Sequence, residues 1–186
     1  MLSHLRPALV FVGGFTLLLG LAYPLSMTAI ATTLLPHQAE GSLIRQGDHV
    51  LGSALVGQNF TAPGYFHPRP SAAATPYDAA ASSGSNLGPL SQKLIDRVRA
   101  DVAASGLAAP VPADAVTASA SGLDPDISPQ NARAQVARVA AARGLAPERV
   151  AALVTDQTRQ PVLGLFGEPR VNVLALNRAL DTLAAE

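Results

Sequence analysis

The sequence contains no cysteine and no tryptophan, and Lys93 is its only lysine. Without cysteine the chain cannot form disulfides, thiolate metal ligands or a cysteine nucleophile, so its folded part must be stabilised by packing alone. Lys93 does not lie in a G-x-x-x-x-G-K-[ST] loop, so the phosphate-binding loop of P-loop nucleotide hydrolases is absent as well. The sequence therefore gives no support to autonomous ATP hydrolysis.

Motifs of zinc enzymes and serine hydrolases are also missing. The histidines are widely separated and form no H-x-x-x-H or H-E-x-x-H pair, so we expect no metal site. No G-x-S-x-G elbow is present, and the loop serines are expected to serve as turn residues. These serines are Ser82, Ser83, Ser85, Ser119 and Ser121. We predict no catalytic and no cofactor-binding residue in this chain.

Neither sign of charge is in excess, because thirteen Lys and Arg residues balance thirteen Asp and Glu residues. No basic block is present, which excludes a nucleic-acid-binding surface. Asp124 and Asp126 flank Pro125 without forming an EF-hand loop, so Asp124 is expected to accept a turn hydrogen bond. The arginines at positions 133, 138 and 143 are five apart and do not closely share one helix face, so we expect them in solvent, with a partner-facing series of arginines as the alternative.

A long apolar stretch from Pro7 to Pro36 contains no Asp, Glu, Lys or Arg. A helix over residues 8–31 would be roughly 36 Å long at about 1.5 Å per residue, enough to cross a hydrocarbon core of about 30 Å. Pro24 would then be tolerated as a local kink. The stretch predicts one membrane-spanning helix, with membrane lipid as its surroundings.

The flanks of this stretch predict its orientation. Arg6 precedes it, whereas the first positive residue beyond it is Arg45, so the N-terminus is expected in the cytoplasm. This divides the chain into a cytoplasmic leader (1–6), a transmembrane anchor region (7–36) and an extracytoplasmic domain (37–186). A cleaved signal peptide remains an alternative because Ala29-Ile30-Ala31 matches an A-x-A site, although the apolar run exceeds the usual length of such a segment.

The outer part is predicted to be one α+β domain dominated by helices. Two β-rich runs around Gly47-Asp48 predict a short hairpin, and residues 115–119 a further short strand, followed by a tight connector over 121–129. Amphipathic helices are expected over 90–106, from the Ser128 cap to Gly144, from Pro147, and from the Asn172 cap to the C-terminus. The last three should bury Ala132, Val136, Val139, Ala140, Val150, Leu153, Val154, Val173, Leu176, Leu180 and Leu183.

Residues 57–77 differ from the rest because they combine several prolines with half of the chain's aromatic residues: Phe60, Tyr65, Phe66 and Tyr77. One interpretation is an irregular segment whose rings fill the core. The other is a rigid docking surface, because aromatic and arginine side chains anchor interfaces and proline lowers the entropy cost of ordering. The sequence leaves both open.

Ordered blocks along the chain resemble the C subunit of the bacterial Kdp potassium-transporting ATPase. They include Arg69-Pro70-Ser71-Ala72, Ser82 to Pro89, Thr117 to Asp124, Ala142-Arg143-Gly144-Leu145 and Gly167 to Leu174. The likeness covers essentially the whole chain, including the N-terminal anchor. It implies a subunit of a potassium import pump in the bacterial inner membrane.

The resemblance implies three partners: a channel-like A subunit that selects potassium, a P-type ATPase B subunit that hydrolyses ATP, and a small F subunit. ATP and potassium are then handled by the complex. The C subunit of this family is described as a catalytic chaperone that raises the ATP affinity of the B subunit, so a non-catalytic accessory role is expected here. A membrane-tethered extracytoplasmic serine hydrolase is the alternative from another class.

We expect the outer domain to cap the outer mouth of the A subunit through three loops, residues 65–72, 82–89 and 121–129. The helix faces are needed for the domain's own core, whereas these loops combine Pro and Gly restraint with polar and aromatic side chains. The candidate interface residues are Tyr65, Phe66, Arg69, Ser71, Ser85, Asn86 and Asp124. Arg69 and Asn86 are the strongest candidates among them.

Overall fold

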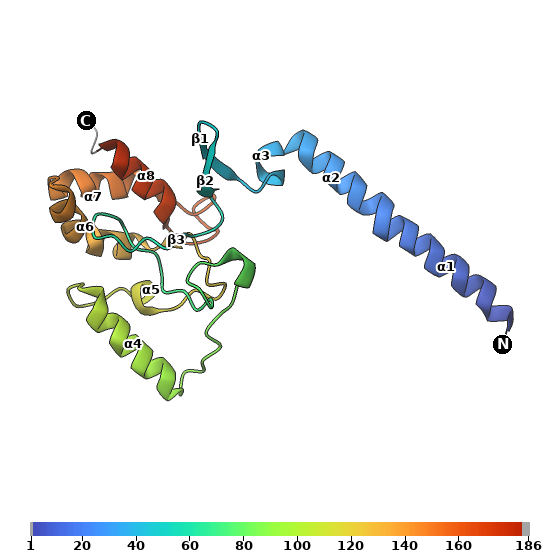
Figure 1. Cartoon of the computed structure of the whole chain (residues 1–186), viewed down its shortest axis with the longest axis horizontal. Helices are drawn as coiled ribbons and strands as arrows, with labels where there is room; N and C mark the ends of the chain where they lie inside the picture. The colour runs from blue at the N-terminus through green and yellow to red at the C-terminus, as the bar shows by residue number, and fades with distance from the viewer. Residues whose placement is uncertain (1, 184–186) are drawn as a thin grey trace. The chain divides into compact units, whose positions relative to one another are not determined.

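A computed structural model describes residues 2–183 and confirms an α+β chain with a long N-terminal helix and a short hairpin (Figure 1). The chain forms two compact units, Met1–Leu51 and Gly52–Glu186. The division between them falls inside the second strand of the hairpin. The expected boundary at residues 36 and 37 stays a prediction.

The first unit is mainly one continuous helix, Leu5–Leu34, with a mean hydropathy of 2.0. A short 3₁₀ turn, η1 (Leu2–His4), precedes it, and its parts are α1 (Leu5–Leu17), η2 (Leu18–Ala22) and α2 (Tyr23–Leu34). At about 1.5 Å per residue this helix is long and apolar enough to cross a membrane. Almost all of its side chains are exposed, as lipid-facing side chains would be.

Pro24 is accommodated by a change in helix type. The five residues before α2 form a π-helical stretch, which absorbs the ring and the missing N–H group of a proline within a helix. Hydroxyl groups on the following turns donate to carbonyl oxygens four residues earlier, so they stay satisfied without water. They belong to Ser26, Thr28, Thr32 and Thr33, at 2.6–2.9 Å.

The predicted hairpin follows the helix. A short helix, α3 (Pro36–Ala39), leads into β1 (Leu43–Gln46) and β2 (His49–Ser53), which pair as a two-stranded sheet. Gly47 occupies the turn with φ of 58°, a left-handed conformation that glycine adopts without strain. The Gly-Asp turn read from the sequence is confirmed.

The second unit combines helices with a small three-stranded sheet (Figure 1). Its strands are β3 (Asp126–Ile127), β4 (Thr158–Arg159) and β5 (Arg170–Asn172), antiparallel in the order β3–β5–β4. Its helices are η3 (Ala79–Ala81), α4 (Gln92–Ser105), α5 (Ala113–Val116), α6 (Pro129–Arg143), α7 (Pro147–Asp156) and α8 (Val173–Leu183). Helix α7 packs on α6 and α8, and β5 contacts both α6 and α8.

The helix ends follow local signals. Ser128 caps α6 by accepting a hydrogen bond from the Asn131 N–H at 3.0 Å, and Gly144 ends that helix with φ of 66°. Asn172 accepts from the Ala175 N–H at 3.0 Å and so caps α8. These hydrogen bonds and the conformation of Gly144 confirm the predicted caps. The caps could be predicted because each depends only on residues nearby in the sequence.

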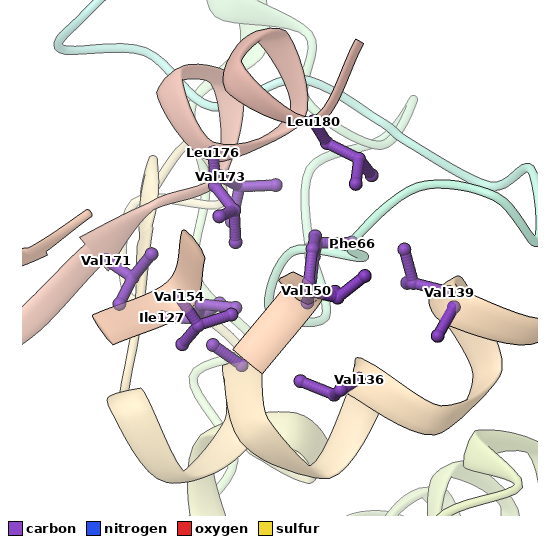
Figure 2. Close-up of a cluster of buried hydrophobic side chains, with 12 residues drawn as sticks. Phe66, Ile127, Val136, Val139, Val150, Val154, Val171, Val173, Leu176 and Leu180 are labelled. Carbon is purple, nitrogen blue, oxygen red and sulfur yellow. The ribbon is translucent and has the colours of Figure 1, made fainter. Parts of the chain in front are cut away.

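The core forms where α6, α7, α8 and β5 meet, and Figure 2 shows Phe66 lying among their side chains. Phe66, Val139, Val150, Val154 and Leu180 are completely buried. The predicted inner faces of α6, α7 and α8 are confirmed, except that Leu153 and Leu183 remain partly exposed. The phenyl ring thus belongs to the core, as the first interpretation of residues 57–77 proposed.

Two sequence expectations are wrong. Residues 113–116 form helix α5 rather than a strand over 115–119. The connector over 121–129 contains β3, whose register pairs Asp126 with Asn172 and Ile127 with Val171. Strands of two or three residues are too short to show an alternating pattern, so only their distant partner reveals them.

Candidate partner-docking site

The segment that carries the predicted contacts is held first by Asn177 of α8. The Asn177 Oδ1 atom accepts from the Phe66 N–H at 2.8 Å, and its Nδ2 atom donates to the Phe66 carbonyl oxygen at 3.0 Å. One side-chain amide therefore satisfies both backbone groups of a buried residue, as a neighbouring strand would. We call this pair the Asn177 clamp.

Gln135 of α6 repeats this arrangement one residue later. Its Oε1 atom accepts from the His67 N–H at 2.7 Å, and its Nε2 atom donates to the His67 carbonyl oxygen at 3.1 Å. The Nε2 atom also donates to Asn131 Oδ1 at 2.9 Å, and Asn131 donates in turn to Asp114 at 3.1 Å. This Gln135 clamp is therefore the end of a connected polar network that starts at α5.

Two arginines bind the backbone of residues 63–65, just before the clamped residues. Arg138 donates to the Pro63 and Tyr65 carbonyl oxygens at 2.6 and 3.0 Å. Arg143 donates to the Gly64 carbonyl oxygen at 2.7 Å and lies over the Tyr65 ring at 4.5 Å. The expectation that these arginines face solvent is wrong for both, because five residues along a helix still allow long side chains to reach one extended segment.

Beyond the clamps, Arg69 ties the segment to a second loop. Arg69 Nη1 lies 2.7 Å from Asp124 Oδ2, and both side chains are roughly three-quarters buried. The other Asp124 oxygen accepts from the Asp126 N–H at 3.1 Å, which confirms the predicted turn acceptor. Burial makes this ion pair less exposed to salt screening than a surface pair.

Ser71 and Tyr77 add further hydrogen bonds around the Arg69–Asp124 pair. Ser71 Oγ donates to the Gly122 carbonyl oxygen at 2.8 Å and accepts from the Tyr77 N–H at 3.2 Å. The Tyr77 hydroxyl donates to the Arg69 carbonyl oxygen at 2.7 Å, and burial followed by the Asp124 charge raises the pKa of Tyr77 above its ordinary value. The tyrosine therefore stays a neutral donor.

A third loop joins through its backbone. The Ser83 N–H and the Ser82 hydroxyl both donate to the Ser121 carbonyl oxygen, at 3.0 and 2.9 Å. A Cβ atom at Gly84 would lie 2.7 Å from the Ala120 carbonyl oxygen, so only glycine permits this approach. We call residues 65–77, 82–86 and 117–124 the loop cluster. The three predicted docking loops are thus neighbours in the folded domain.

The predicted contacts have different surroundings within the loop cluster. Phe66 is completely buried and is therefore not available as a surface contact, which corrects its inclusion. Tyr65, Arg69, Ser71 and Asp124 are partly buried and bonded within the domain. Ser85 is partly exposed. Asn86 is exposed in a left-handed conformation with φ of 50°.

The loop serines make turn contacts, as expected. Ser119 is buried, lies 3.1 Å from the Ser121 hydroxyl and accepts from the Gly122 N–H at 3.1 Å. Within residues 2–183, no histidine is hydrogen-bonded to any serine of the loop cluster, so the geometry gives no nucleophile and base pair. The serine hydrolase alternative gains no support.

An open cavity of about 410 Å³ lies beside the loop cluster. Its lining includes Arg69 and Tyr77 of the loop cluster, Asp101 of α4, and Gln135 and Arg138 of α6. The cavity could receive one or two side chains of a partner. Its lining combines polar and apolar side chains, as the recesses of protein interfaces do.

The residues missed by sequence reasoning are the clamps themselves. Gln135 and Asn177 are buried amides placed within the apolar faces of α6 and α8. A polar residue inside a buried helix face must find a partner, so its position is a usable signal. The partner lies 68 and 111 residues away respectively, which local patterns cannot reveal.

His67 provides a pH-dependent test of this geometry. Burial, with the nearby Arg138 charge, lowers its pKa below the ordinary value of 6.5. The unfolded chain takes up a proton as pH falls through about 6.5, whereas the folded domain resists it, so stability should decrease below that pH. Urea denaturation of the full chain, followed by circular dichroism at pH 7.5 and 5.5, should show a lower midpoint at pH 5.5.

The matched variant His67→Gln removes the titrating group while keeping a hydrogen-bonding side chain. It should lose part of the decrease in the urea midpoint between these two pH values. An unchanged pH dependence in His67→Gln would show that His67 is not the group that destabilises the domain in acid.

Comparison with known proteins agrees with the resemblance seen in the sequence. The family described as "KdpC: K+-transporting ATPase, c chain" matches residues 5–182. A "Potassium-transporting ATPase KdpC subunit" of Caulobacter vibrioides is 63% identical over 97% of this chain and 94% of its own length. Proteins of the same name from Allorhizobium ampelinum and Rhodospirillum rubrum are 59% and 57% identical, covering 100% and 97% of this chain and 99% and 96% of their own lengths. The chain therefore belongs to the KdpC family, the accessory c-chain subunits of potassium-transporting ATPases.

Proposed function

We propose that this chain is a non-catalytic subunit whose second unit docks, through the loop cluster, on the channel-like A subunit at the outer mouth of the pump. The observation that carries the proposal is the convergence of three separate loops around the Arg69–Asp124 pair. Such a convergence gives a surface built from several parts of the chain. The small F subunit and the P-type B subunit complete the proposed complex.

The loop cluster suits docking because it is already ordered. Backbone and side-chain hydrogen bonds fix residues 65–77 before any partner arrives, so little conformational entropy remains to be lost on binding. The apolar faces of α6, α7 and α8 are used in the domain's own core and are not free for a partner. Docking through the loops therefore leaves the fold undisturbed.

An effect on ATP affinity would then be indirect. If residues 37–186 lie outside the cell, they cannot touch cytoplasmic ATP. Docking would instead favour one conformational state of the pump, and the nucleotide affinity of the B subunit would change through the coupling between states. Assembly and stabilisation of a transport-competent state are the proposed contributions of this chain.

We infer that the long N-terminal helix is retained as a single-pass anchor of the inner membrane, with the N-terminus in the cytoplasm. The helix runs without a break from Leu5 to Leu34, beyond the A-x-A pattern at Ala29 to Ala31. Intact-mass measurement of the purified chain should therefore give the full-length protein. A chain that begins at Thr32 would identify a cleaved signal peptide and refute the anchor.

Asn86 offers the cleanest test of docking, because its side chain is exposed and its backbone is left-handed. Asn86→Gly removes the side chain but keeps a residue that adopts this conformation easily. We expect recovery of the co-purified A subunit in mild detergent to fall by roughly tenfold, the effect of a central interface residue worth about 1.4 kcal/mol. The far-ultraviolet circular dichroism of the chain should not change.

Arg69→Ala and Asp124→Ala test the positioning role of the ion pair. Each should weaken recovery, and the effect of the double variant should be smaller than the sum of the two single effects, because either change alone already removes the ion pair. Arg133→Ala, at an exposed arginine of α6, is the matched control and should have no effect. Normal assembly of the Asn86 and Arg69 variants would show that the loop cluster is structural only.

A further inference from the structure

The turn between β4 and β5 exposes an unusual number of large apolar side chains. Val162, Leu163, Leu165 and Phe166 are 62%, 84%, 81% and 65% exposed. They lie on adjacent residues at one end of the antiparallel β4–β5 pair, with Pro161 before them. We call residues 161–166 the apolar tip. Contiguous exposed apolar residues of this kind mark a contact surface.

The apolar tip is free of charge. No Asp, Glu, Lys or Arg occurs from Gln160 to Gly167. Arg159 and Glu168 bound it at the two sides, and Arg170 behind them is paired with Asp126 at 3.1 Å. Burial of the apolar tip in lipid therefore would not remove any charged side chain from water.

The backbone of the apolar tip is largely satisfied by itself. Val162 and Phe166 exchange two N–H to carbonyl hydrogen bonds, each of 3.0 Å. The Gly164 N–H donates to the Pro161 carbonyl oxygen at 3.0 Å, and the Leu165 N–H to the Val162 carbonyl oxygen at 3.2 Å. This matters for lipid, because unpaired backbone groups are what keep irregular loops out of a membrane.

The turn also places a leucine where the backbone disfavours one. Leu163 has φ of 55° and Gly164 has φ of 70°, so both central residues are left-handed. Turns of this type normally use asparagine or glycine at the first position. A leucine there costs conformational energy while presenting a large apolar side chain to the outside, which favours a role for the side chain beyond the fold.

We propose that the apolar tip inserts shallowly into the interfacial zone of the lipid bilayer. This inference rests on the membrane anchor proposed above: a retained helix Leu5–Leu34 keeps the membrane surface within reach of this domain. Even a weak affinity is then sufficient, because a tethered group meets its target at a high effective concentration. Insertion of the tip would steady the outer domain while the loop cluster remains free for the protein partner.

A partner subunit that covers the same side chains is the competing explanation. The self-satisfied backbone and the absence of charge favour lipid, because irregular backbone is tolerated at membrane depth only where its polar groups are satisfied. The lipid contact also requires no other subunit. The chain alone, reconstituted in vesicles, should therefore show it.

The lack of cysteine makes a direct experiment possible, because any introduced cysteine is unique. Full-length Leu165→Cys carrying an environment-sensitive fluorophore is reconstituted in phosphatidylcholine–phosphatidylglycerol vesicles, with shallow spin-labelled lipid as quencher. Ala134→Cys, at an exposed position of α6, is the matched control. We expect quenching several-fold stronger at position 165 than at position 134, and little change when salt is raised because the tip is uncharged.

A second variant distinguishes insertion from chance proximity. Leu163→Asn is added to the labelled chain. Asparagine tolerates the left-handed turn but is polar, so this change should weaken insertion and lower the quenching at position 165. Equal quenching at positions 165 and 134, or no effect of Leu163→Asn, would overturn the proposal. The proposal would also be overturned if the label at position 165 were protected from an aqueous quencher in the assembled pump but not in the chain alone. That result would assign the apolar tip to a protein partner.

Discussion

The second unit depends on two side-chain amides that act as strand partners. Asn177 and Gln135 bind the N–H and carbonyl groups of Phe66 and His67, which lie in no helix or strand. An unpaired buried backbone group costs about 1–3 kcal/mol, so these four hydrogen bonds decide whether the segment can enter the core at all. The phenyl ring of Phe66 fills the core only because its backbone is satisfied there.

The loop cluster follows from this constraint. Once residues 66 and 67 are fixed, Arg69 is brought to Asp124 and Ser71 to the Gly122 carbonyl oxygen. The loop of residues 117–124 then binds the loop of residues 82–86, because the Ser121 carbonyl oxygen accepts hydrogen bonds from Ser82 and Ser83. In this arrangement a surface assembled from three loops is held in place by a core that contains no disulfide.

The sequence was informative where structure is local and silent where it is distant. Helices α6, α7 and α8 could be predicted, because Ser128, Gly144 and Asn172 mark their ends and apolar spacing marks their faces. Strands β3, β4 and β5 could not, since each depends on a partner distant in the chain, and the sequence left open whether Phe66 fills the core or a docking surface. The same holds for the site: its loops could be chosen from composition, but the amides and arginines that hold them could not.

The most direct test of this account is amide hydrogen exchange in an Asn177→Leu variant of the full chain, which keeps the branched shape of the side chain and removes both hydrogen bonds of the clamp. The account predicts faster exchange throughout residues 63–77, including those around Ser71 and Tyr77, while the amides of α6 keep their protection. Unchanged exchange beyond Phe66 in a folded variant would contradict it, because the loop cluster would then be ordered without the clamp.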